Sequence, residues 1–502
     1  MSQLVRSALV AVLVACSLAA CAGGSTPRLT STPTGEDGPA NVERFYTQKL
    51  TWVRGADNLD STKVTVPSDW AHPDGDTISI AVVRRASSGA ASGSLLINPG
   101  GPGQSGVDFL TQGGDGTITA AVRERYDLVS FDPRGVGRSA PVRCYRSTAE
   151  NDAWLYGPVA AAPGTDAWAS ELEARYRGHA DACLSTSGKL LEHLDSASTA
   201  RDMDVIRALL GDKRLSYLGY SYGTFLGTVY AELFPSKVGR MVLDGAVGPD
   251  GPSRAWRVRQ AAGFEGAFRS YLADCVADTK TCPFTGGLES ARSQAATLIS
   301  AADSRALEAP DGRRLTSTTL VTAITSYLYD KQLWPQVTTL FAAVKRKDVT
   351  PVFDAADASH GRVDGSYSNV DDAQVAVLCN DRPLEPAPSA SDEFQGLVAA
   401  STTFGAYLSD GGALCGTWPY PARERPGLDA GTLPRTLVIG TTEDPATPYE
   451  QARSLAAYLT SGLVTLTGYG HTAYGRDDCV NRAVEQYLVD GRRPSSHVQC
   501  RS

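Results

Sequence analysis

The feature that most constrains this chain is a short apolar run that ends at a serine flanked by glycines. Residues 215–218 are typical of a buried strand, the sequence Gly-Tyr-Ser-Tyr-Gly centred on Ser221 follows directly, and 224–233 has the character of a helix. A strand that turns sharply into a helix strains the backbone at the turn, and the two glycines leave room for neighbouring chain. The pattern predicts an α/β fold that displays the Ser221 hydroxyl at the end of a central strand.

Similar apolar runs, each bounded by Gly, Pro or Asp, predict the rest of the sheet. Residues 77–83 alternate apolar and polar side chains, which favours an early antiparallel strand. Helix-like stretches such as 197–210 lie between the later runs, so a doubly wound and mostly parallel sheet is expected. The predicted parallel strands span 94–98, 126–131, 215–218, 241–243, 436–439 and 463–466.

The alternation of strands and helices fails between 251 and 428. This stretch contains amphipathic segments at 261–272 and 316–333 and four cysteines. We expect it to be a helical cap over the carboxyl ends of the strands, where α/β proteins bind their ligands. The core then has two parts, 41–250 and 429–502.

The first residues predict export. Arg6 precedes an apolar stretch that is too short to span a bilayer, and the sequence Leu-Ala-Ala-Cys ending at Cys21 follows it. This ending resembles a bacterial lipobox, so we expect 1–21 to be a signal peptide and Cys21 to carry a lipid anchor on the outer face of the cell membrane. An ordinary signal peptide with an incidental cysteine is the alternative. Residues 22–40 are rich in Gly, Ser, Thr and Pro, which predicts a flexible linker.

Cysteine use agrees with export. Of the ten cysteines, all but Cys16 and Cys21 lie beyond the predicted signal peptide, and their even number suggests disulfides in a non-reducing compartment. None has the close spacing of a zinc or thioredoxin-like site. Many pairings are possible, and the simplest joins neighbours: Cys144–Cys183, Cys275–Cys282, Cys379–Cys415 and Cys479–Cys500.

Charge and composition argue against some partners. The net charge is −8 and no run of Lys and Arg occurs, so we expect no nucleic-acid partner. The sequence has no sign of a metal site or of an organic cofactor.

A nucleophilic serine needs a histidine as base and a carboxylate that orients the histidine. In α/β hydrolases the chain order is serine, acid, histidine. His471 follows the predicted strand 463–466 and is the only one of the six histidines so placed after Ser221. It is therefore the predicted general base.

Three acids compete for the orienting role. Asp444 lies after the predicted strand 436–439, and Glu443 is the residue directly before Asp444. Asp244 also ends a predicted strand. We favour Asp444 because its loop leads into a helix, with Thr447 expected as the N-cap and Glu450 as the second half of a capping box. Such a cap would hold the carboxylate against the histidine.

The tetrahedral intermediate of acyl transfer needs preorganised hydrogen-bond donors. One expected donor is the backbone N–H of Tyr222, directly after the serine. The other should come from the loop 99–103, Pro-Gly-Gly-Pro-Gly, where paired glycines let the backbone face a substrate. A further motif, Asp-Pro-Arg-Gly at 132–135, is expected to shape the pocket wall.

Five motifs in this order resemble the tripeptidyl-aminopeptidase group of α/β-hydrolase serine peptidases, relatives of the prolyl aminopeptidases. The resemblance runs from about Phe45 to the C-terminus. It implies an exported exopeptidase, in several members an envelope lipoprotein, that removes short peptides from free N-termini through an acyl-enzyme. It also implies that Gly101 is the oxyanion glycine. The motifs are Pro99 to Gly103, Ser130 to Gly137, Gly219 to Thr224, Asp444 to Pro448 and Gly470 to Thr472.

An exopeptidase of this kind must hold the ammonium group of its substrate, and a carboxylate suits that need. Cys379-Asn380-Asp381 resembles an element of the family's cap, so Asp381 is the candidate anchor; an exposed aspartate beside a disulfide is the alternative. The chain departs from many relatives in lacking cysteines at 53–65, shortly after Trp52. This removes an N-terminal bridge and leaves the predicted site untouched.

The leading hypothesis is thus a secreted serine exopeptidase. A carboxylesterase or lipase with the same triad is the alternative, because this fold hosts many chemistries. A catalytically inactive envelope binding protein is a third hypothesis, against which the complete set of catalytic elements argues.

Overall fold

The computed structural model describes residues 31–36, 38, 41–382, 389–423, 425, 427, 436–494 and 497–501. The predicted signal peptide with Cys21, most of the predicted linker and the predicted end of the cap at 428 lie outside these ranges. Within them, none of the helices combines the length and the apolar character needed to cross a bilayer.

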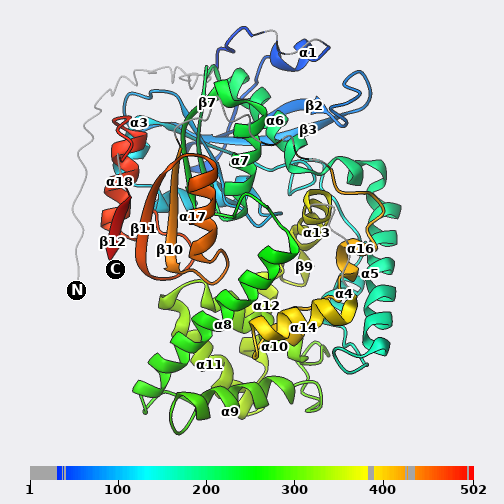
Figure 1. Cartoon of the computed structure of the whole chain (residues 1–502). Coiled ribbons are helices and arrows are strands. Elements are labelled where there is room, and N and C mark those ends of the chain that lie inside the picture. Colours follow the sequence, from blue (N-terminus) through cyan, green and yellow to red (C-terminus); the bar gives the residue numbers. More distant parts are fainter. Residues whose placement is uncertain are drawn as a thin grey trace, which may run out of the picture.

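One sheet of ten strands forms the centre of the described chain (Figure 1), in the order β1-β2-β3-β5-β4-β6-β7-β10-β11-β12. The first three strands are antiparallel, β3 also pairs antiparallel with β5, and the strands from β5 onward are parallel to one another. The predicted mostly parallel sheet is confirmed. Its strands are β1 (Val53–Arg54), β2 (Leu59–Pro67), β3 (Thr77–Arg85), β4 (Ser94–Asn98), β5 (Asp127–Phe131), β6 (Leu215–Tyr220), β7 (Val238–Asp244), β10 (Leu437–Glu443), β11 (Gly462–Tyr469) and β12 (Val498–Arg501).

Helices cover both faces of this sheet. On β4, Leu96 belongs to the apolar core shared with α6 and α7, whereas Leu95 and Ile97 belong to the core shared with α3 and α18. Successive side chains of a strand point to opposite faces, so burial of both faces explains the continuous apolar runs. The helices outside the cap are α1 (Glu43–Tyr46), α2 (Gly106–Thr111), α3 (Ala120–Arg125), α4 (Thr148–Tyr156), α5 (Asp166–Ser187), α6 (Ser196–Leu210), α7 (Tyr222–Leu233), α17 (Tyr449–Tyr458) and α18 (Asp478–Leu488).

The segment between β7 and β10 is helical and lies beyond the carboxyl ends of the parallel strands, at the bottom of Figure 1. It has an apolar core of its own, which includes Phe268, Ile324 and Phe341. A small hairpin, β8 (Arg362–Val363) and β9 (Ser366–Tyr367), interrupts the helices. The cap helices are α8 (Arg254–Ala277), α9 (Leu288–Ser300), α10 (Ser317–Leu328), α11 (Trp334–Lys345), α12 (Thr350–Ser359), α13 (Val370–Asp381), α14 (Ala390–Ala400), α15 (Gly405–Leu408) and α16 (Ala413–Gly416).

The prediction of one helical segment over 316–333 is wrong only beyond Leu328. Helix α10 ends at Leu328, and the Asp330 side chain accepts a hydrogen bond from the Gln332 N–H, which starts a short 3₁₀ turn. A side chain that binds the backbone locally competes with continuation of the helix. The 3₁₀ turns of the described chain are η1 (Ala56–Asn58), η2 (Gly114–Thr117), η3 (Gly188–His193), η4 (Pro235–Lys237) and η5 (Lys331–Leu333).

Four disulfides join neighbouring cysteines, in the pairing that the sequence suggested. One closes the excursion that carries α4 and α5, two lie in the cap, and one ties α18 to β12. They are Cys144–Cys183, Cys275–Cys282, Cys379–Cys415 and Cys479–Cys500.

Candidate active site

Ser221 occupies the sharp turn between β6 and α7. Its φ of 54° and ψ of −125° are a strained combination for a residue with a side chain. The turn is held by two backbone bonds: the Ser221 N–H donates to Asp244 O at 2.9 Å, and Thr224 N–H donates to Ser221 O at 2.9 Å. A Cβ on Gly219 would lie 2.4 Å from the oxygen of Gly223, so the turn requires glycine there.

His471 lies in the loop after β11 and faces the carboxylate of Asp444, which follows β10. The His471 Nδ1 is 2.9 Å from both carboxylate oxygens. Its Nε2 is buried and has no hydrogen-bond partner among the described residues, and the ring lines the same cavity as Ser221. With Nδ1–H donating to Asp444, Nε2 can accept a proton from a hydroxyl in that cavity.

The Asp444 carboxylate is fixed by its own loop. It accepts the N–H groups of Ala446 and Thr447 at 2.9 Å and the Thr447 hydroxyl at 3.0 Å. The predicted capping box is wrong: α17 begins at Tyr449, Pro448 is its N-cap, and no side chain caps it. The Thr447 hydroxyl donates to Asp444 instead. Asp444 forms a local turn in which its side chain binds the N–H groups two and three residues on, as aspartate readily does.

The two competing acids have other partners. Asp244 is fully buried and accepts the N–H groups of Ala473 and Tyr474 at 2.9 and 2.8 Å, so it holds the loop that follows His471. Burial raises the pKa of Asp244 to about 6. Glu443 is exposed and accepts the Ser270 hydroxyl at 3.0 Å. Of the three acids, Asp444 is the one whose hydrogen bonds reach the imidazole.

The glycine loop after β4 runs beside the serine turn. A Cβ on Gly100, whose φ is +97°, would lie 3.0 Å from the Ser221 Cβ and 3.1 Å from the Tyr222 nitrogen. Gly101, with φ of +104°, lines the same cavity as Ser221. The loop therefore approaches the backbone N–H of Tyr222 at a distance that only glycine permits.

The cavity around Ser221 has a volume of about 690 Å³ and is lined by both the core and the cap. The core contributes Ser221 and His471. From the cap, Tyr329 places its ring 5.3 Å from the imidazole and its carbonyl accepts the His471 N–H at 2.8 Å. His360 and Asp371 also line the cavity, and their side chains are hydrogen-bonded at 3.1 Å.

Comparison with known proteins agrees with this geometry. Residues 93–328 match the family described as alpha/beta hydrolase fold, and 400–500 match the TAP-like protein family. Serine protease Hip1 of Mycobacterium tuberculosis is 36% identical over 460 residues, which cover 87% of this chain and 86% of the relative. Tripeptidyl aminopeptidase of Streptomyces lividans is 34% identical over 451 residues, covering 87% and 82%. Carboxylesterase B of Mycobacterium tuberculosis is 37% identical over 449 residues, covering 87% and 85%.

The chain belongs to the tripeptidyl-aminopeptidase group of α/β-hydrolase serine peptidases. It is accordingly a serine hydrolase, as the motifs around Ser221 and His471 predicted.

In this hydrolase, Asp381 does not line the cavity around Ser221, contrary to the role suggested for it. Its carboxylate accepts the Ser196 N–H at 2.8 Å and the hydroxyl of Tyr222. Burial, and then the neighbouring charge of Asp195, raise the pKa of Asp381 to about 7. The residue thus fastens the end of α13 to the start of α6 and to the residue after the nucleophile.

Asp371 is the acid that sequence reasoning missed. It lies in the first turn of α13, ten positions before Asp381, and is the one carboxylate among the described residues that line the cavity. The available signal was the sequence Asn-Val-Asp-Asp within the predicted cap, but neither aspartate could be told from a solvated one without the fold.

The motif at 132–135 does not line the cavity either. Arg134 is fully buried and makes two bonds to the Asp202 carboxylate, at 2.7 and 2.8 Å. The Asp132 carboxylate accepts the N–H groups of Val107 and Arg138. The motif braces the loops behind the site rather than forming its wall.

Two groups of side chains in the described chain lie close enough together to share a metal ion. They are Cys144 with His179 and Cys183, and Asp477 with Cys479 and Cys500. In each group the two cysteines form a disulfide, so their sulfurs are not available as thiolate ligands.

Proposed function

We propose that this hydrolase is a serine exopeptidase that releases short peptides, of tripeptide size, from free N-termini. The observation that carries the proposal is a cavity in which a buried histidine nitrogen and a strained serine lie on the core side and a single carboxylate lies on the cap side. A cavity of about 690 Å³ is of the size that binds small ligands. The relatives named as serine protease and tripeptidyl aminopeptidase support a peptide substrate.

The chemistry follows from the atoms around Ser221. The His471 Nε2 takes the hydroxyl proton as the Ser221 oxygen attacks the scissile carbonyl, and Asp444 stabilises the imidazolium that forms. The N–H groups of Gly101 and Tyr222 stabilise the oxyanion. The C–N bond breaks as the leaving amine receives the proton from His471, and a water molecule then hydrolyses the acyl-enzyme in the same way.

Asp371 is the proposed site for the substrate's ammonium group. A carboxylate attracts a cation through charge-assisted hydrogen bonds, and these bonds are the stronger class in proteins. Among the described residues that line the cavity, Arg476 supplies the one guanidinium, and it is paired with Asp330 at 3.0 Å. Asp371 is itself hydrogen-bonded to His360 at 3.1 Å. A carboxylate in this cavity suits a free N-terminus better than it suits an ester without charge.

A carboxylesterase is the second candidate, and the relative named Carboxylesterase B favours it. The same serine, histidine and oxyanion donors cleave esters as readily as amides. Only the contribution of Asp371 separates the two candidates in the structure, because an uncharged ester has no use for it.

The test is hydrolysis of free and N-acetylated tripeptide nitroanilides and of short acyl esters by wild type and Ser221→Ala. We expect wild type to prefer the free peptides, and Ser221→Ala to lose about three orders of magnitude or more in kcat while its unfolding curve is unchanged. Equal turnover of free and acetylated peptides would overturn the exopeptidase proposal in favour of the esterase. Failure of a fluorophosphonate probe to label Ser221 would leave a binding protein without catalysis.

We also propose that the protein is exported and anchored by lipid on Cys21 to the outer face of the cell membrane. The lipobox-like sequence and the four disulfides, which persist in oxidising compartments, support this. Replacement of Cys21 by Ser should abolish incorporation of labelled palmitate and move the protein from the membrane fraction to a soluble one. An unchanged distribution of the variant would contradict anchoring at this cysteine.

A further inference from the structure

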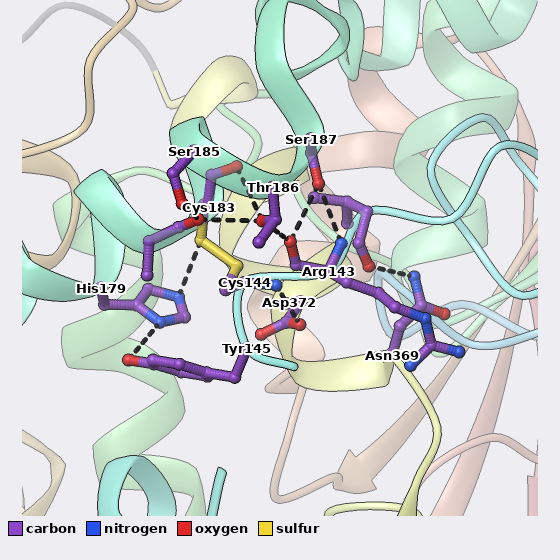
Figure 2. Close-up of a disulfide and its surroundings, with 12 residues drawn as sticks. Arg143, Cys144, Tyr145, His179, Cys183, Ser185, Thr186, Ser187, Asn369 and Asp372 are labelled. Carbon is purple, nitrogen blue, oxygen red and sulfur yellow. Dashed lines mark hydrogen bonds between the residues drawn. A yellow bond between two sulfur atoms is a disulfide. The ribbon is translucent and has the colours of Figure 1, made fainter. Parts of the chain in front are cut away.

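The first turn of α13 is fastened to a loop of the core that we call the strap, residues 132–144. The strap follows β5 and ends at Cys144, whose disulfide to Cys183 joins it to α5. On the α5 side of this disulfide, the His179 ring is stacked on Trp154 with ring centres 4.0 Å apart. Burial lowers the pKa of His179 to about 3, so the ring stays neutral, and its Nδ1 is hydrogen-bonded to the Tyr145 hydroxyl at 3.2 Å (Figure 2). The strap therefore has a firmly held end.

Two side chains of the cap attach α13 to this strap (Figure 2). The Asn369 amide donates to Gly135 O at 2.7 Å and to Val142 O at 2.8 Å, and its oxygen accepts the Gly137 N–H at 2.9 Å. The Asp372 carboxylate accepts the Cys144 N–H at 2.8 Å.

Both side chains are buried, with exposed fractions of 5% for Asn369 and 7% for Asp372. A buried polar group that loses its partner costs free energy, so these four bonds define one position for the turn. The Asn369 amide uses both its donors and its acceptor, so its three bonds fix the orientation of the turn as well as its position.

The same turn reaches both sides of the active-site cavity. Asp371, between the two attached residues, lines the cavity from the cap. A Cβ on Gly103 would lie 2.5 Å from Val370 O and 2.9 Å from the Gln374 nitrogen, so the turn packs directly on the glycine loop of the oxyanion site. The position of this one turn thus sets where Asp371 lies relative to the serine.

For an exopeptidase, the separation between Asp371 and Ser221 sets the length of the peptide that is released. An extended peptide advances by about 3.3–3.6 Å per residue, so the distance from the ammonium-binding carboxylate to the nucleophile determines how many residues lie between them. A turn that could shift by a fraction of this length would accept peptides of neighbouring lengths.

We propose that Asn369 and Asp372 are specificity-determining positioning residues, which hold Asp371 at the separation from Ser221 that selects the length of the released peptide. The proposal rests on the proposed exopeptidase function. Neither residue touches the substrate; each acts through the turn that carries Asp371.

The test measures kcat/KM for nitroanilides of di-, tri- and tetrapeptides with free N-termini. Asn369→Asp removes both amide donors, and Asp372→Ala removes the acceptor of the Cys144 N–H. In each we expect the ratio of kcat/KM for the best length over the next length to fall by at least about fivefold, which is the effect of one or two lost hydrogen bonds. Asp372→Asn keeps an oxygen acceptor and should retain the wild-type ratio.

Ser401→Ala is the matched control. Its hydroxyl is buried in the cap and donates to Glu265 at 2.7 Å, far along the chain from the strap, so its loss should weaken the cap without altering the ratio. Because a ratio of two substrates does not depend on the amount of active enzyme, partial unfolding cannot imitate the expected change. Titration with a fluorophosphonate reports the folded fraction of each variant.

An unchanged ratio in both Asn369→Asp and Asp372→Ala would overturn the proposal, as would a wild type without a length preference. A ratio that falls equally in Ser401→Ala would also overturn it, since general loosening of the cap would then suffice. Failure of the exopeptidase function itself is distinguishable, because acetylated and free peptides would then react equally in the wild type.

Discussion

At Ser221 the backbone is strained, and the glycines around it leave the space that this strained turn needs. The positive φ of Ser221 is maintained by backbone bonds to Asp244 and Thr224, and Gly219 and Gly100 leave the space that the turn needs. The strain is confined to one residue, and the neighbouring strand and helix stabilise it. A side chain at either glycine would displace the hydroxyl or the oxyanion loop.

The proposed role of Asp371 gives a prediction for a single side chain. Asp371→Asn keeps the size and the bond to His360 but removes the negative charge. We expect KM for a free tripeptide nitroanilide to rise about tenfold or more, because a charge-assisted bond to the ammonium group is lost. The acetylated peptide is the internal control and should be cleaved at the wild-type rate. Equal losses with both peptides would mean that Asp371 does not recognise the amine.

Asp381 gives a pH prediction. The pKa of this carboxyl is about 7 in the folded protein against a usual value of 3.8, so between these values the folded state binds more protons than the unfolded state. The free energy of unfolding therefore falls as pH rises from about 4 to 7. Asp381→Asn removes this dependence, so its stability relative to wild type should improve from pH 5 to pH 8.

Urea unfolding of Asp381→Asn and wild type at pH 5 and pH 8 measures this difference. The exposed Asp74 supplies the control variant, Asp74→Asn, for which the difference from wild type should be the same at both pH values. A constant difference for Asp381→Asn would show that its carboxyl titrates normally in the fold.

At the scale of elements, the strap connects parts of the core that are distant in sequence. Arg134, in the strap, is fully buried and bonds to Asp202 of α6 and to the carbonyls of Pro67, Ser68 and His193. One guanidinium thereby joins the end of β2, η3 and α6. A planar fork with five donors suits this position as no other side chain does.

Replacement of Arg134 by Met should destabilise the fold strongly. The Asp202 carboxylate would remain buried without its counter-charge, which costs about 3–5 kcal/mol of the free energy of unfolding. The double variant Arg134→Met, Asp202→Leu should recover part of this loss. Urea unfolding measures both.

Arg177→Met is the surface control. Arg177 pairs with Glu173 at an exposed site on α5, where the loss should be at most about 1 kcal/mol. A loss of similar size for Arg134→Met would mean that the buried pair adds little beyond its packing.

The same scale shows where element predictions succeed. The strands at the centre of the sheet are continuous apolar runs because they are buried on both faces. Such runs can be recognised from the local sequence alone. The edge strands β1 and β12 are short, and β2, which lies next to β1, alternates buried and exposed residues; these three strands were not predicted. The start of α17 was misplaced because an Asp444 turn and a capping box use the same residue types.

At the scale of the molecule, the active site lies where the sheet core and the cap meet. The core supplies the serine, histidine and orienting acid, and the cap supplies Asp371 and Tyr329. The cap has its own apolar core and two of the four disulfides, and it rests against the excursion that carries α5 (Figure 1). On the proposed function, substrate selection and chemistry depend on different segments of the chain.

The sequence by itself determined the fold class and the serine hydrolase chemistry, and it predicted Ser221, Asp444 and His471 as the triad, because each follows a strand whose apolar pattern is local. Only the tertiary structure decided which cap acid faces the cavity. Asp371 and Asp381 lie on one helix and have the same chemistry, and the direction in which each points is determined by packing of α13 against the strap and α6. Such long-range packing leaves no periodic pattern in the sequence, so it is read only from the folded chain.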